Sequence, residues 1–267
     1  MKIILSRKGF DSGYEKVPSP IMPDGTLLSL PIPNEDDMVE YEQLRYKEKS
    51  YAQIISELTK CKFSEKNCHL YPDIRRDVLA RSEKWTPSFG QTSAALTHLR
   101  NEDVGKDDLF LFFGWFRKVE EINGEYQYVK EKQSNKHVIY GYLQVGEILC
   151  NPTRKQHPEL GMHPHLDRER DNNAIFVARK TLSWNEDIPG AGCLEYKFER
   201  VLTKKKHPRS HWQLPDFLKE VRISYHSENS WKEDYFKSAD KGQEFVISSD
   251  GNDKVEKWAR DLINLTV

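Results

Sequence analysis

The most apolar stretch of the chain, Asp107–Phe116 (DDLFLFFGWF), limits most strongly what this sequence can fold into. It is too short to span a membrane, and its aromatic and aliphatic residues suit a strand that is buried on both faces. His137–Leu149 (HVIYGYLQVGEIL) has the same character, and the polar segment between the two contains Asn123-Gly124, a typical tight-turn pair. We therefore predict three antiparallel strands in this region, two of which form the centre of a sheet.

The remaining elements are shorter and do not alternate regularly between strand and helix. Strands are predicted at Lys2–Leu5, Ala174–Leu182, Leu194–Leu202 and Glu244–Ile247, and helices at about Asp36–Lys47, Tyr51–Lys60, Ser88–Leu99 and Asp253–Leu265. The irregular order argues against a doubly wound α/β sheet. We predict a single α+β domain over residues 1–267, with flanking helices on a mostly antiparallel, potentially barrel-like sheet.

Charge and motif content exclude several classes of function. The 41 basic and 42 acidic residues give a net charge of −1, so a nucleic-acid partner would need a local basic face. The four cysteines lack paired C-x-x-C spacing, which argues against a zinc ribbon or a disulfide framework. The sequence has no Walker loop, G-x-G-x-x-G or G-x-S-x-G motif, which argues against ordinary NTPases, Rossmann enzymes and α/β-hydrolases. With no leader and no apolar span, we expect a cytoplasmic protein with no membrane partner.

The loop after the first predicted strand offers one candidate site. Its sequence, SRKGFDSG, places Arg7, Asp11 and Ser12 beside two glycines that allow close approach of the backbone. Arg7 and backbone N–H groups could bind a phosphate or a carboxylate, and Asp11 could position a ribose or act as a base. A solvated turn is the alternative.

Two histidines stand near groups that suit acid–base chemistry. His69 and Asp73 lie four residues apart, and a histidine beside a carboxylate can exchange protons near neutral pH. A surface ion pair is the alternative for them. Gln91 and His98 lie seven residues apart, so on one helix they would share a face, from which Gln91 could contact the edge of a base. Packing beneath the sheet is the alternative for His98.

Two segments carry weaker signals for a metal. In an extended strand, His163, His165 and Asp167 would lie on one side, but the spacings of known metal sites are absent and no metal is assigned. Asp187 followed by Glu195-x-Lys197 has the order found in magnesium-dependent nucleases. A chance occurrence explains so short a pattern as readily as a magnesium site does.

A basic run, TKKKHPRS, occupies residues 203–210, shortly after Lys197. Lys204–Lys206 and Arg209 could contact a phosphate backbone, with the nearby Trp212 as a stacking aromatic. A charged solvated loop is the alternative.

Several phrases, taken together, resemble one known family. They are MKIILSRKGFDS, VPSPIMPDGTLLSLPIP, GQTSAALTHL, DDLFLFFGWF, VIYGYLQVGEI and KGQEFVI. The chain is similar over nearly its whole length to the third nucleotide-modification-associated domain family of bacteria and phages. The resemblance implies a link to modified nucleotides or DNA and supplies neither a reaction nor a cofactor. The central hairpin also resembles that of PUA-like barrels, which bind modified bases and RNA.

Three hypotheses of function follow. The first is an enzyme that acts on a nucleotide or nucleic-acid base in a DNA-modification or phage-conflict system. The resemblance places the family's polar motif positions on ten residues of this chain. Of these, we expect Asp11, His69, Asp73 and His98 to be catalytic, and Arg7, Ser12, Asp24, Gln91, Gln243 and Glu244 to bind the substrate. The second is a non-catalytic PUA-like reader of modified bases, and the third is a metal-dependent nuclease. The sequence leaves the cofactor and the oligomeric state open.

Overall fold

Two long strands form the centre of the molecule, where the most apolar segments predicted them. β9 (Leu109–Ile122) pairs antiparallel with β11 (Lys136–Cys150) and with β10 (Glu125–Tyr128). Asn123 and Gly124 connect β9 to β10 with positive φ angles of 53° and 83°, the conformation that an Asn-Gly hairpin turn requires. The prediction of three antiparallel strands is confirmed. The computed structural model describes residues 1–10, 17–131, 134–168, 172–239, 244–249 and 251–265.

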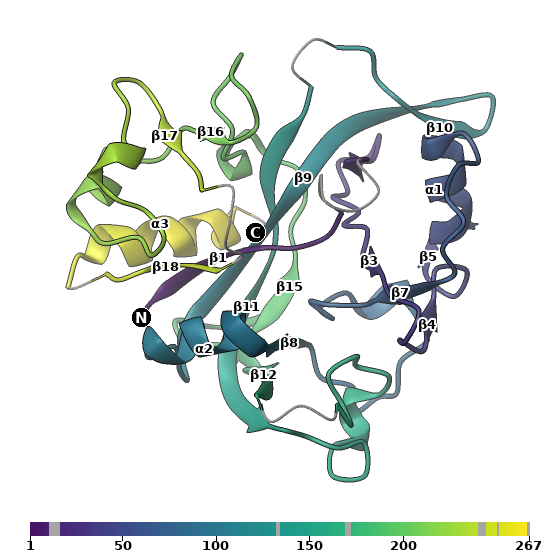
Figure 1. Cartoon of the computed structure of the whole chain (residues 1–267), viewed down its shortest axis with the longest axis horizontal. Coiled ribbons are helices and arrows are strands. Elements are labelled where there is room, and N and C mark those ends of the chain that lie inside the picture. Colours follow the sequence, from purple (N-terminus) through teal and green to yellow (C-terminus); the bar gives the residue numbers. More distant parts are fainter. Residues whose placement is uncertain (11–16, 132–133, 169–171, 240–243, 250, 266–267) are drawn as a thin grey trace.

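Nine strands of the described chain form one sheet (Figure 1). Its main path runs through β18 (Glu244–Ile247), β1 (Ile3–Arg7), β9, β11, β12 (Asn173–Ala178) and β8 (Ser88–Thr92), while β2 (Ser19–Ile21), β10 and β15 (Ala191–Cys193) join β9 or β11. β1 and β2 run parallel to β9, and the other pairs are antiparallel. The predicted α+β class with a mostly antiparallel sheet is confirmed. The predicted barrel-like form is not observed, because the described residues show no strand pairing between β18 and β8, the two ends of the sheet.

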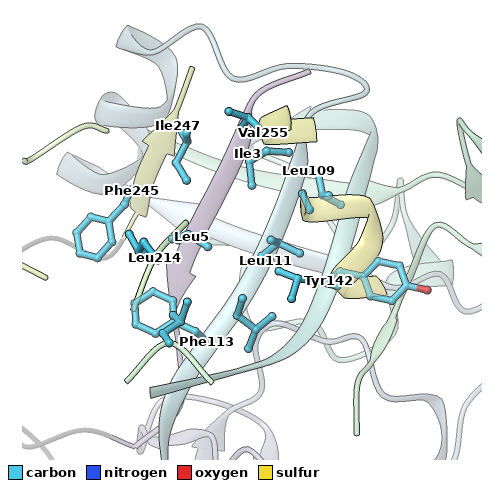
Figure 2. Close-up of a cluster of buried hydrophobic side chains, with 14 of the residues drawn as sticks. Ile3, Leu5, Leu109, Leu111, Phe113, Tyr142, Leu214, Phe245, Ile247 and Val255 are labelled. Carbon is cyan, nitrogen blue, oxygen red and sulfur yellow. The ribbon is translucent and has the colours of Figure 1, made fainter. Parts of the chain in front are cut away.

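Alternate residues of the central strands enter two different cores. Ile3 and Leu5 of β1 point to one face, where Figure 2 shows them with Leu109, Leu111 and Val255 of α3 (Asp253–Asn264). The residues between them point to the opposite core, which contains Ile4, Phe89, Phe110, Phe112 and Phe176. Successive side chains of a strand point to opposite faces, so one sheet fills both cores. Both faces are apolar, as the unbroken apolar run predicted.

Two helices lie where the sequence places them. α1 (Tyr51–Thr59) begins at Ser50, whose Oγ accepts from the Gln53 N–H while the Gln53 side chain accepts from the Ser50 N–H. This reciprocal capping box satisfies two backbone donors that the first turn would leave unpaired. α3 agrees with the predicted C-terminal helix to within one residue.

Two other predicted helices are wrong, one in part and one entirely. Ser88–Leu99 divides into strand β8 and helix α2 (Ser93–Asn101), because residues 88–92 pair with β12. Asp36–Lys47 contains no helix. Its β4 (Val39–Glu40) pairs with β7 (Asn67–His69), and its β5 (Arg45–Tyr46) pairs with β6 (Lys49–Ser50). Strand pairing outweighs local helix propensity in both segments.

The other described elements are short. β3 (Ile32–Pro33) also pairs with β7, β13 (Thr181–Leu182) pairs with β14 (Asn185–Pro189), and β16 (His211–Trp212) pairs with β17 (Phe236–Lys237). The predicted strand Leu194–Leu202 is wrong: the segment is irregular and includes a 3-10 turn at Phe198–Arg200. None of the described helices is long and apolar enough to cross a membrane.

Candidate functional site

A buried acid lies where the two ends of the sheet approach each other. Glu244 begins β18 and Gln91 lies in β8, yet Gln91 Nε2 donates to Glu244 Oε1 over 2.5 Å. Lys8 Nζ donates to the same oxygen over 2.7 Å, and the side chains of Lys8 and Glu244 are both 1% exposed. We call these three residues the Lys8–Gln91–Glu244 cluster. The sheet is thus curved enough for its end strands to touch through side chains without closing.

Strand alternation explains why polar groups enter an otherwise apolar core at this place. Ser6 of β1 pairs with Glu244 of β18, and Lys8 follows two residues later on the same face as Ser6. Glu244 Oε2 and Ser6 Oγ are both buried, and neither has a hydrogen-bond partner among the described residues. Buried polar atoms in folded proteins are nearly always hydrogen-bonded, so these two oxygens mark a place that can accept a further donor.

The surroundings of Lys8 shift the pKa of its ammonium group. Burial lowers the pKa of the Lys8 ammonium, and the Glu244 carboxylate opposes that shift. Lys8 Nζ also lies 4.9 Å from the centre of the Phe89 ring and 5.3 Å from that of Tyr71, distances at which a cation is attracted by the ring faces. A lysine whose pKa is lowered by burial gives up its proton more readily than an exposed lysine, and the adjacent carboxylate is a second group that can hold a proton.

A second cluster of ionisable groups adjoins the first through Tyr71, whose ring centre lies 4.2 Å from that of His69. His69 Nδ1 is hydrogen-bonded to Asp37 Oδ2, and His69 Nε2 lies 3.3 Å from His165 Nε2. Arg168 reaches both His69 Nδ1, over 3.4 Å, and Asp37 Oδ1, over 3.8 Å. Burial lowers the pKa of His69, which Asp37 opposes, and burial lowers that of His165 to about 3.

This histidine cluster borders a polar hollow. The hollow has a volume of about 370 Å³, and Asp37 and Arg168 are among the residues that line it. Its remaining charged lining residues are Asp36, Arg154 and Asp167. Solvent and small polar molecules can therefore approach the Asp37–His69 pair from this side.

Two of the predicted site residues lie close to the first cluster. His98 of α2 is hydrogen-bonded through Nε2 to Ser224 Oγ over 3.0 Å, and that oxygen accepts from the Val246 N–H of β18 over 2.8 Å. Gln91 and His98 thus reach β18 from a strand and a helix, so the predicted shared helical face is wrong.

Arg7 lies on the opposite face of β1 from Lys8. It donates to the Ala239 carbonyl over 3.2 Å, and its guanidinium carbon lies 5.9 Å from the Phe245 ring centre.

Two other predicted residues have structural partners elsewhere. Asp73 does not pair with His69. Its carboxylate accepts from Arg81 Nη1 over 3.0 Å and from Trp85 Nε1 over 3.2 Å. Burial raises the pKa of Asp73 to about 6, although Arg81 opposes the shift. Asp24 lies in an exposed turn, where it accepts from the Thr26 N–H over 3.0 Å and from the Tyr46 hydroxyl over 2.7 Å.

Three predicted site residues, Asp11, Ser12 and Gln243, lie outside the described residues. The sequence alone did not indicate that Lys8, Asp37, Tyr71 and His165 belong to these clusters. For Lys8 a signal existed, because it continues the alternation of Ile4 and Ser6 on one face of a buried strand. Asp37 had no such signal, since it fell in a segment that was predicted to be helical.

The predicted one-sided arrangement of His163, His165 and Asp167 is wrong. The segment is a series of turns, and Asp167 has a φ of 57° and pairs with Arg154 over 3.1 Å at the surface. His163 and His165 are buried against β8, so close that a Cβ on Gly90 would lie 2.3 Å from the His165 ring. Within the described ranges, no three His, Cys, Asp or Glu side chains are arranged to hold a metal ion.

The nuclease pattern is not assembled either. Asp187 and Glu195 belong to no metal-holding group of the described chain. Lys197 Nζ donates to the Leu265 carbonyl.

Comparison with known proteins identifies the class. The model of the family described as nucleotide modification associated domain 3 matches residues 2–248. The chain therefore belongs to this family, as its sequence phrases indicated. The match includes β1, β8 and β18, the strands that position the Lys8–Gln91–Glu244 cluster. No curated protein and no solved structure matches the chain.

Proposed function

We propose that this protein is an enzyme that alters the base of a nucleotide or of a nucleic acid, and that the Lys8–Gln91–Glu244 cluster binds this base and exchanges a proton with it during the reaction. Membership of a nucleotide-modification-associated family supports a nucleotide or nucleic acid as the partner. Proteins read bases through carboxylates that accept from amino groups and through amides that contact base edges. The cluster contains one group of each kind beside a lysine whose pKa is lowered by burial.

The proposal rests on one observation: among the described residues, only one of the two carboxylate oxygens of Glu244 has hydrogen-bond partners. Oε1 accepts from both Lys8 and Gln91, whereas Oε2 is buried with no partner among the described residues. A base amino or imino N–H at Oε2 would satisfy that oxygen and would place the base within reach of the Lys8 ammonium. Gln91 is held in orientation, because its Oε1 accepts from the Thr92 N–H over 3.0 Å.

The roles of the surrounding residues follow from their contacts. His98 and Ser224 brace β18 next to Glu244, so they act as positioning residues. His69, paired with Asp37 beside the polar hollow, is the second group that can exchange protons with solvent. The proposed setting is a DNA-modification system, in which a base is altered before or after it enters the polymer.

A comparison of cells that express different variants tests the proposal. DNA and nucleotide pools from cells that express the wild-type chain, Glu244→Gln or Asp216→Asn would be digested to nucleosides and compared by mass spectrometry. We expect an altered nucleoside with the wild type and with Asp216→Asn, and its loss with Glu244→Gln. Each variant removes one negative charge, and Asp216 is a matched control because its side chain is 91% exposed.

The pattern of results separates the hypotheses. If the purified chain binds nucleotides but leaves every nucleoside unchanged in cells, it is a reader and the proton exchange is wrong. If the altered nucleoside persists with Glu244→Gln, the cluster is not the site.

A further inference from the structure

A second hollow has the composition of a single-strand nucleic-acid site and shares no lining residue with the Lys8–Gln91–Glu244 cluster. Its volume is about 430 Å³, within the roughly 300–1,000 Å³ that is usual for ligand pockets. Tyr196 and Phe198 are its aromatic lining residues, and its charged ones are Glu131, Lys136 and Lys204–Lys206. Four lysines and one glutamate make this a locally basic place on a chain whose net charge is −1.

Phe198 is an exposed aromatic ring on a firmly held segment. Its side chain is 73% exposed, more than any other large hydrophobic residue of the described chain. Two residues later, the buried Arg200 donates to the carbonyls of Leu262 and Glu195 over 2.9 and 2.8 Å. The Tyr196 N–H donates to the Gly25 carbonyl over 2.8 Å. An aromatic ring that presents its surface to solvent from a held segment of backbone is what an unpaired base needs for stacking.

The lysines beside this ring are available to anions. Lys205 and Lys206 are exposed, and no ion pair joins either of them to another described residue. Lys204 differs, since its Nζ pairs with Asp234 over 2.5 Å. Lys118 adds a cation next to the hollow, with its Nζ 5.6 Å from the Tyr196 ring centre. Phosphates that follow a base stacked on Phe198 would meet positive charge on more than one side.

Trp212, which the sequence indicated as the stacking aromatic, is not the exposed ring of this hollow. Trp212 is 0% exposed, and its Nε1 donates to His137 Nδ1 over 3.0 Å. The basic run of residues 204–206 is therefore accompanied by Phe198 and Tyr196 instead of Trp212.

We propose that the hollow formed by Tyr196, Phe198, Lys136 and Lys204–Lys206 binds single-stranded nucleic acid, with a base stacked on Phe198 and the lysines on flanking phosphates. A single strand is favoured over a duplex because its bases are free to stack on a protein ring. This surface goes beyond the proposed chemistry at Glu244 and does not depend on it.

Fluorescence anisotropy with labelled oligothymidylate and oligouridylate tests the surface and distinguishes DNA from RNA as its ligand. We expect Phe198→Ala to weaken binding by roughly fivefold to 150-fold, the range of one base–aromatic stack. The double variant Lys205→Ala/Lys206→Ala should lower the slope of log K against log salt by about 1.4, because each contact of a lysine with a single-strand phosphate contributes about 0.7.

Matched controls make the outcome decisive. Lys254→Ala/Lys257→Ala removes the same two charges from exposed positions on α3 and should leave both the affinity and the salt slope unchanged. The inference is overturned if neither strand binds at low salt, if Phe198→Ala binds as the wild type does, or if the α3 control weakens binding as much as Lys205→Ala/Lys206→Ala.

Discussion

Gln91 and Glu244 are 153 residues apart in the sequence and lie on the two end strands of the main sheet, yet their side chains are joined by a hydrogen bond of 2.5 Å. Lys8, the residue after β1, completes the contact, and β1 is the strand next to β18. The sheet thus brings three distant segments to one buried polar point between apolar cores. Substitutions at and around these three residues test whether the contact supports the fold and whether it binds a base.

The buried pair of Lys8 and Glu244 should be strongly coupled in stability. Lys8→Met leaves the Glu244 carboxylate buried and uncompensated, so we expect the free energy of unfolding to fall by about 3–5 kcal/mol. In Lys8→Met/Glu244→Gln neither charge remains, and most of that loss should be recovered. Urea unfolding of both variants measures the difference. A double variant that is as unstable as Lys8→Met would contradict the pairing.

Gly90 should tolerate no side chain. An added Cβ would lie 2.3 Å from the His165 ring and 2.8 Å from that of His163, both of which are buried. We expect Gly90→Ala to lower the free energy of unfolding by about 1–3 kcal/mol through overpacking. Gly105→Ala is the matched control, because nothing lies within 4 Å of its added Cβ. Equal effects of the two substitutions in thermal or urea unfolding would show that the histidines do not pack on β8 as described.

The histidine cluster should make stability fall as the solution becomes acidic. Burial lowers the pKa of His165 to about 3 in the folded protein, whereas an unfolded histidine titrates near 6.5. Between these values the unfolded state binds the additional proton, so stability is full above about pH 6.5 and is lost as the pH falls toward 3. The contribution of this one group is at most about 1.4 kcal/mol per pH unit.

His165→Gln isolates that contribution from the other titrating groups. The raised pKa of Asp73 acts in the opposite direction, since its stabilisation is lost as the pH rises through about 6. The difference between the wild type and His165→Gln cancels this and other shared effects. We expect urea unfolding at pH 5 and pH 7 to show a smaller loss on acidification for the variant. Identical losses would refute a neutral, buried His165.

The sequence predicted the parts of the fold that are governed by local pattern. Asp107–Phe116 and His137–Leu149 became β9 and β11 because apolar runs of that length have no other stable place than the centre of a sheet. The helix predicted at Tyr51–Lys60 became α1, and the capping box that begins it is a contact between neighbours, Ser50 and Gln53. Ser88–Thr92 was missed as a strand because its partner, β12, lies far along the chain.

The candidate site was less accessible to sequence reasoning, for the same physical reason. Gln91 and Glu244 were identified by their family positions, but their contact depends on the curvature of a sheet of which they form the two ends. The partner of His69 proved to be Asp37, 32 residues away, instead of the nearby Asp73. Asp73 accepts hydrogen bonds from Arg81 and Trp85 instead, and the local spacing of residues did not indicate these partners.

The most direct test of the central proposal is the dissociation constant of nucleoside monophosphates, measured by calorimetry. The variant to use is Lys8→Met/Glu244→Gln, which removes both charges of the cluster and is expected to retain the fold, compared with the wild type and Asp216→Asn. If a base binds at Glu244, the double variant should bind the preferred nucleotide at least about tenfold more weakly, as expected for the loss of a hydrogen bond to a charged group. Asp216→Asn, at an exposed position, should bind as the wild type does. Unchanged affinity in the double variant would contradict the proposal that the Lys8–Gln91–Glu244 cluster is the site.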